Sequence, residues 1–161
     1  MSLWKSVKSL KVKHIFTFLV LFAKHPLYAY ATIKGTALTF KISERRFPKI
    51  HGGLNKANAF RHSLWNILIA KYAMKFSNDV TSVLDWTKRV TDLHEELAPN
   101  EYLAREMDLI NNDLGRRWFN NVKNKSNSEI EEFLMDKLKN AIKINQASNL
   151  ENLDNLVFLE D

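Results

Sequence analysis

The sequence predicts an all-α fold: a single compact helical domain of about four core helices, preceded by a basic, apolar N-terminal helical arm. With 161 residues the chain fits one domain that can bury a sizeable core. It contains only 4 Gly and 3 Pro, too few for the many turns of a β-sandwich or barrel. Apolar residues recur at intervals of three and four, which is the spacing of helix faces.

Basic residues are concentrated at the start of the chain. The 24 Lys and Arg against 18 Asp and Glu give a formal net charge of +6. Residues 1–50 have a balance of +9, whereas residues 51–161 have a balance of −3. The basicity therefore belongs to one segment, and no nucleic-acid motif accompanies the pair Arg45 and Arg46, so we do not expect a nucleic-acid partner. We expect an arm over 1–50, a helical domain over 51–145 and an acidic tail over 146–161.

The arm alternates lysine with apolar residues and is then apolar from Ile15 to Ala23. Nine helical residues rise only about 13 Å, too little to cross a hydrocarbon layer of about 30 Å. A basic start and a short apolar run also occur in secretory signals. The apolar pattern continues to Phe40, however, where a mature protein should turn polar, so we do not expect a cleaved signal.

Two interpretations of the arm stay open. It could be an amphipathic helix on an anionic membrane surface, or a core helix with a solvated lysine face. The absence of Cys excludes a disulfide scaffold, a thiolate metal site and a cysteine nucleophile, and it fits a reducing compartment. We therefore expect a cytoplasmic protein, at the inner face of the membrane under the first interpretation.

Breaks in the apolar pattern define the core helices. Gly52 and Gly53 close the arm, and polar or proline-containing breaks follow at 77–79, at 98–100 and at 123–128. Ser126 and Glu129 have the spacing of a capping box. Residues 146–161 contain four acids and no bases, which predicts a loose tail. The expected helices span 55–76, 81–97, 101–122 and 126–145.

Polar residues fall on the apolar sides of three of these helices. A buried polar group without a partner costs about 1–3 kcal/mol, so such groups should meet one another. Spacings of three, four, seven and eight residues place them on continuous faces. We expect one shared polar cluster with the members Asn58, Arg61, His62, Asn66, His94, Asp108, Asn111 and Arg116.

Such a mixture of His, Asn, Asp and Arg is used for metal ligation, acid–base chemistry and anion binding. His62, His94 and Asp108, with His51, could hold a divalent metal, although no HExxH spacing is present. Without a metal, a histidine would act as base and an arginine would hold an anionic substrate group. The expected catalytic residues are His62, His94, Glu95 and Asp108, and the expected substrate-binding residues are Asn58, Arg61, Asn66, Asn111, Asn112 and Arg116.

Three blocks resemble an uncharacterised bacterial all-helical domain family: N-A-F-R-H-S-L-W-N at 58–66, H-E at 94–95 and M-D-L-I-N-N-D-L-G-R at 107–116. The resemblance covers about residues 50–120 and also carries Trp65 and Gly115. Its members are small stand-alone proteins or C-terminal parts of secreted proteins with toxin-like organisation. Many have His where this chain has Ile110, and if that His were essential this chain would be a binding-only member.

Two functional hypotheses follow. The first is a small hydrolase, metal-assisted or His-based, that acts on a phosphoester or lipid substrate near a membrane surface. The second is a non-catalytic module that binds a membrane surface or a protein partner and whose polar cluster is structural.

Overall fold

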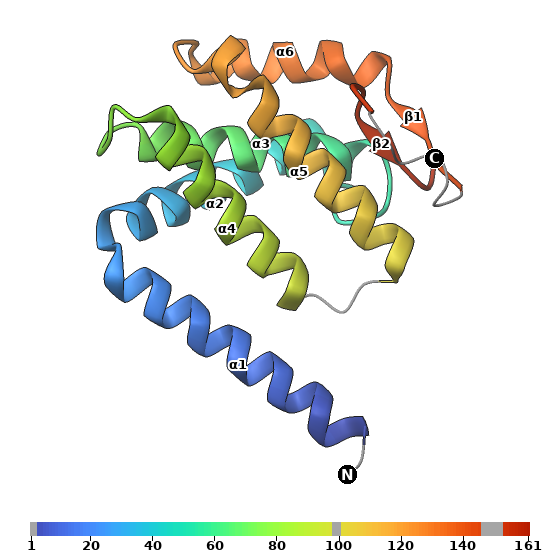
Figure 1. Ribbon diagram of the computed structural model, residues 1–161. Helices are drawn as coiled ribbons and strands as arrows, with labels where there is room; N and C mark the ends of the chain where they lie inside the picture. The colour runs from blue at the N-terminus through green and yellow to red at the C-terminus, as the bar shows by residue number, and fades with distance from the viewer. Residues whose placement is uncertain (1–2, 98–100, 146–152) are drawn as a thin grey trace.

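The computed structural model describes residues 3–97, 101–145 and 153–161, with side chains described from residue 14 onward (Figure 1). The predicted break at 98–100, the first part of the predicted tail at 146–152 and the side chains of the lysine-rich start lie outside these residues. Most of the described residues are helical and only two short strands are present among them, which confirms the all-α prediction. The elements are α1 (Leu3–Lys24), α2 (Pro26–Arg46), α3 (Lys56–Ala73), α4 (Val80–Leu97), α5 (Tyr102–Val122), α6 (Asn127–Lys139), β1 (Ile142–Lys143) and β2 (Val157–Phe158).

α3 is the central helix of the domain. It is buried on almost every side and contacts α2, α4, α5 and α6 (Figure 1). Asn55 caps its first turn by accepting hydrogen bonds from the backbone N–H groups of Ala57 and Asn58. Phe60, Leu64 and Leu68 of α3 are fully buried and belong to the largest apolar cluster. Because α3 is buried on almost every side, it organises the packing of the other helices.

Two glycines allow other helices to approach α3 closely. A Cβ atom on Gly35 of α2 would lie 2.8 Å from the backbone nitrogen of Ile69. A Cβ atom on Gly115 of α5 would lie 2.5 Å from the carbonyl oxygen of Ser63. Both distances are shorter than side-chain atoms tolerate, so each contact requires a residue without a Cβ atom.

The segment before residue 50 forms two helices with different surroundings. α2 contributes Ala31 and Ile42 to the main core and packs against α3, as the core-helix interpretation expects. α1 contacts α4 and α2 through its inner side, where Leu21 is buried. None of the described helices is both long and apolar enough to span a bilayer.

Two sequence expectations near the C-terminus are wrong. The last helix begins with the predicted capping box of Ser126 and Glu129 but ends at Lys139, not at residue 145. β1 follows directly and pairs in parallel with β2, with Ile142 opposite Val157. Residues 153–161 are therefore not a loose tail, because Leu156, Val157 and Phe158 are buried despite the acidic composition around them.

Substitution of Gly115 by Ala tests the close approach of α5 to α3. Alanine in a helix interior ordinarily stabilises by about 0.5–1 kcal/mol relative to glycine. Here the added methyl group meets backbone, so we expect the free energy of unfolding, measured by urea denaturation, to fall by about 1–3 kcal/mol. Gly52→Ala is the control, since a Cβ atom there meets nothing within 4 Å. Unchanged or increased stability of Gly115→Ala would contradict the packing described.

Candidate functional site

Asn112 of α5 is the centre of a buried hydrogen-bond network. Its Oδ1 atom accepts a hydrogen bond from Asn66 Nδ2 at 2.7 Å and lies 3.2 Å from His62 Nδ1. Both Asn66 and His62 belong to α3. Its Nδ2 atom donates to Glu95 Oε1 of α4 at 3.1 Å. One carboxamide thus connects three helices, and both Asn66 and Asn112 are completely inaccessible to solvent.

The surroundings of His62 define which ring nitrogen carries the proton. Nδ1 faces the acceptor Asn112 Oδ1, so the neutral ring donates from Nδ1. Nε2 then has a free lone pair, and it lies 2.8 Å from an Nη2 donor of Arg61. Nε2 is also 3.3 Å from Asp108 Oδ1, while Nδ1 is 3.6 Å from Glu95 Oε1. The imidazole therefore lies between two carboxylates, with Arg61 beside its basic nitrogen.

Arg116 anchors the other end of the network. Its Nη1 atom donates to Asn66 Oδ1 at 2.9 Å and lies 3.2 Å from Thr91 Oγ1. Its Nη2 atom lies 3.3 Å from Asp113 Oδ1. Arg116 is only 8% exposed, so this charged residue is held inside the domain and not at its surface.

Burial determines the protonation states in the cluster. Desolvation lowers the pKa of His62 well below its ordinary value of 6.5, and the nearby charge of Arg61 lowers it further. Desolvation raises the pKa of Glu95, opposed by the hydrogen bond from Asn112. Burial also lowers the pKa of Arg61, against the attraction of Asp108 and Glu95. A neutral imidazole next to an arginine is therefore the favoured state at neutral pH.

The cluster approaches the surface at Arg61. This side chain is only partly buried, donates from Nε to the His51 carbonyl at 3.0 Å and lies over the Phe40 ring. His94 is exposed and packs edge-on against Trp65, with ring centroids 5.1 Å apart. Arg61 and His94 are therefore the members of the predicted cluster that reach solvent.

Three side chains of the cluster are suited to bind a metal. His62, Glu95 and Asp108 each offer a ligand atom, and these atoms all lie within 4.8 Å of one another. Nitrogen and carboxylate oxygen are ligands for Zn²⁺ or Mn²⁺, whereas an all-oxygen site would favour Mg²⁺ or Ca²⁺. The group could therefore hold a divalent ion. The predicted metal ligands His94 and His51 are not part of this group, and Glu95 is its third member.

Other predicted members lie elsewhere. Asn111 is fully buried but hydrogen-bonds to the backbone of Val157, accepting from its N–H at 3.0 Å and donating to its carbonyl at 2.8 Å. Asn58 donates to the Gly53 carbonyl and thus fixes the loop before α3. The His51 ring pairs with Glu44 at 2.9 Å. The expected single cluster is thus divided between the site and two contacts that hold the backbone.

Sequence reasoning missed Thr91, which lies between Asn66 and Arg116. Its hydroxyl is 3.2 Å from Asn66 Oδ1 and the side chain is fully buried. Thr87, Thr91 and Glu95 recur every four residues along α4, which is the spacing that identified the polar faces of α3 and α5. That spacing would have found Thr91 if hydroxyl groups had been included.

Ile110 lies on the side of α5 away from the cluster. It is two residues from both Asp108 and Asn112, which places it roughly 160° around the helix from each. Its side chain packs against apolar residues of the core. In this fold a His at position 110 would not point toward His62.

Comparison with known proteins identifies a domain family. A family model described as "Domain of unknown function (DUF6973)" matches residues 19–142, most of the chain, and the match includes every residue of the cluster. The match extends beyond the predicted 50–120 on both sides and takes in α2 and α6. No curated protein and no solved structure matches.

Substitution of Asn112 by Ala tests its central position. The change removes a hydrogen-bond partner from buried groups of Asn66, His62 and Glu95, at about 1–3 kcal/mol for each group. We expect the free energy of unfolding to fall by about 3 kcal/mol or more. Asn120→Ala on the exposed side of the same helix should change it little. Equal effects of the two substitutions would contradict the network.

The lowered pKa of His62 predicts a pH-dependent stability. The unfolded chain binds a proton at His62 as the pH falls through 6.5, and the folded protein does so only at lower pH. The wild type should therefore lose about 1 kcal/mol of stability relative to His62→Gln between about pH 7.5 and 5.5. Urea denaturation of both proteins at the two pH values measures this difference. A constant difference would show that His62 titrates normally in the folded state.

Proposed function

Because the chain belongs to the DUF6973 family, whose description names no activity, we propose its function from the geometry of the site. The proposed function is that of a small hydrolase with His62 as general base, acting on a phosphoester or lipid ester. The observation that carries the proposal is the fixed tautomer of His62. Nδ1 faces Asn112 Oδ1, and the basic Nε2 atom lies between Arg61 and Asp108.

His62 has the surroundings of a general base whose ring is held in one orientation by hydrogen bonds. Glu95 accepts a hydrogen bond from Asn112, and Asn112 in turn accepts one from His62. This chain of two hydrogen bonds fixes the orientation of the imidazole ring. A base must be unprotonated at the working pH and reach the proton that it removes. The lowered pKa of His62 meets the first condition, and displacement of Arg61 from Nε2 would meet the second.

Arg61 couples substrate binding to activation of the base. An anionic phosphate or a developing oxyanion competes with His62 for the guanidinium, and this competition releases the Nε2 lone pair. His62 then takes a proton from water, whose oxygen forms a bond to phosphorus or to the ester carbon. Asp108 stabilises the resulting imidazolium at Nε2, and the proton passes to the leaving oxygen as its bond breaks.

A metal-assisted form of the same proposal uses His62, Glu95 and Asp108 as ligands. It requires that Arg61 move away, because a guanidinium and a divalent cation cannot share Nε2. An ion in that position would lower the pKa of a bound water and supply the nucleophile. Removal of divalent ions by a chelator distinguishes this form from the metal-free one.

The second candidate is a binding module in which the cluster only holds α3, α4 and α5 together. The burial of His62, which is 2% exposed, favours it, since a catalytic base must reach substrate. Ile110 does not favour it, because that position faces the apolar core.

The hydrolase proposal predicts turnover that depends on His62. Chromogenic phosphodiester, phosphomonoester and carboxylic ester substrates are assayed with the wild type, with and without added Zn²⁺ or Mn²⁺. We expect His62→Gln to lower kcat/KM by about 10²- to 10⁴-fold, the range of general base catalysis. We also expect the pH profile of the wild type to keep its activity below pH 6.5, because the base stays neutral there.

His14→Gln is the matched control, since that histidine pairs with Glu96 away from the cluster. It should retain full activity. Melting temperatures separate lost chemistry from lost folding. A wild type without turnover on any of these substrates would favour the binding module, and a fully active His62→Gln would contradict His62 as the general base.

A further inference from the structure

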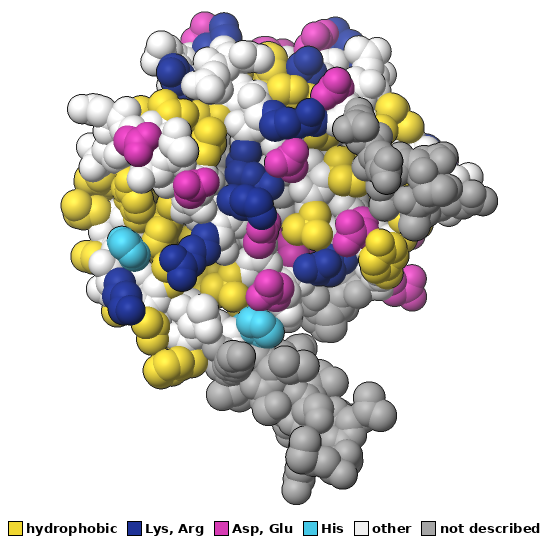
Figure 2. Space-filling model, in the orientation of Figure 1, with side chains coloured by type: hydrophobic (Ala, Val, Ile, Leu, Met, Phe, Trp, Pro, Cys, Tyr) yellow, Lys and Arg dark blue, Asp and Glu magenta, His cyan; other side chains and the backbone are white. Residues whose placement is uncertain are grey.

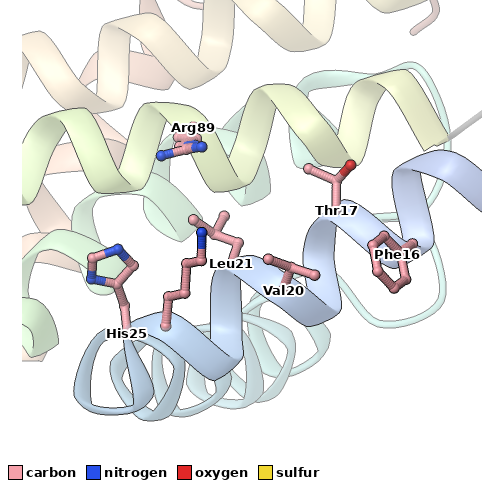
Figure 3. A pocket seen from close by; sticks show the side chains of 7 residues that line it. Phe16, Thr17, Val20, Leu21, His25 and Arg89 are labelled. Carbon is pink, nitrogen blue, oxygen red and sulfur yellow. The ribbon is translucent and has the colours of Figure 1, made fainter.

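A groove with basic sides runs between α1 and α4 (Figure 3). Val20 and Leu21 of α1 form an apolar floor, and Phe16 lies at one end. Arg89 of α4 faces His25 across this floor, and Lys24 also lines the groove. Among the described residues neither Lys24 nor Arg89 has a carboxylate partner, so both charges are available to an anion.

The outer side of α1 beside this groove is apolar and faces solvent. Ile15 is 51% exposed, Phe16 66% and Leu19 65%, although large apolar side chains are normally covered. They lie on the side of the helix opposite the buried Leu21. Burial of Leu21 and exposure of these three show that the core uses one side of α1 and leaves the other unpartnered.

The apolar surface continues around the turn into α2. A second hollow is lined by Lys24, His25, Leu27 and Phe76, so it shares its basic residues with the groove. Leu27 is 57% exposed. Figure 2 shows hydrophobic and basic side chains side by side on the side of the molecule where α1 joins α2. We call the surface formed by Phe16, Leu19, Lys24, Leu27 and Arg89 the α1–α2 corner.

We propose that the α1–α2 corner docks on an anionic lipid surface. Phe16, Leu19 and Leu27 enter the interface between head groups and acyl chains, and Lys24 and Arg89 bind lipid phosphates. Apolar side chains flanked by cations are what an interfacial helix presents to anionic lipid. The remainder of α1 carries four further lysines in its sequence, which adds positive charge at the same end of the chain. This proposal does not rest on the proposed hydrolase.

The charge pattern favours lipid over a protein partner. A protein-binding helix face is typically apolar at its centre and depleted in lysine. Here Lys24 lines the same groove as Phe16 and Leu21. Because no described helix can span a bilayer, the corner would bind at the surface of the membrane and not across it.

Vesicle flotation of the full 161-residue chain tests the proposal. The probes are vesicles of equimolar phosphatidylglycerol and phosphatidylcholine, with pure phosphatidylcholine as the uncharged reference. We expect the wild type to float with the anionic vesicles and to remain in solution with the uncharged ones. Lys24→Gln with Arg89→Gln should lower the partition coefficient about fivefold for each cation removed. Phe16→Ser with Leu19→Ser should abolish flotation.

Two control variants match these changes in charge and exposure. Lys123→Gln with Lys125→Gln removes two cations at the α5–α6 turn, and Tyr102→Ser removes an aromatic ring that is 66% exposed on α5. Both should float as the wild type does. Absence of wild-type flotation, equal flotation with both kinds of vesicle, or equal losses in the control variants would overturn the proposal.

The same assay separates this proposal from the proposed function. His62→Gln should lose turnover and still float, whereas the variants of the α1–α2 corner should lose flotation and retain turnover on a soluble substrate. Melting temperatures confirm that each variant is folded. Flotation of a wild type that has no turnover would leave the docking proposal intact and remove only the hydrolase.

Discussion

The close contact between α3 and α5 is the constraint on which the rest of the domain depends. Gly115 lies so near the Ser63 carbonyl that no side chain fits, and Ser63 donates to the Asn111 carbonyl across the same contact at 2.8 Å. This approach places Asn112 within hydrogen-bond reach of α3. Without it the polar faces of the two helices would be separated, and each would expose its polar groups to an apolar interior.

Asn112 then determines the protonation pattern of the cluster. A carboxamide offers both a donor and an acceptor, so it can satisfy a carboxylate on α4 and an imidazole on α3 at once. Burial of Arg116, Glu95 and Asp108 adds nothing to stability that an apolar core would not supply more simply. A buried histidine whose pKa lies well below its ordinary value, next to charged groups, is typical of functional sites, and this supports the proposed hydrolase.

The α1–α2 corner and the polar cluster around His62 lie in different parts of the domain. Lys24, Arg89 and the exposed Phe16 and Leu19 lie where α1 meets α2 and α4, whereas His62 lies among α3, α4 and α5. The cluster approaches solvent at Arg61, which the His51 carbonyl and the Phe40 ring hold in place. The proposed docking surface and the proposed catalytic site therefore lie in different parts of the chain.

The sequence by itself determined the all-α class, the Ser126 capping box and the polar faces, because helical periodicity and local hydrogen bonds are properties of neighbouring residues. It also identified His62 and Asp108 as members of one cluster, and in the structure His62 Nε2 lies 3.3 Å from Asp108 Oδ1. Periodicity shows which side of a helix is buried but not which helix faces it. Only the tertiary structure therefore assigned Asn111 to β2, placed Glu95 beside His62 and left Phe16 exposed on α1. Each of these outcomes depends on contacts between residues far apart in the chain, which no local pattern encodes.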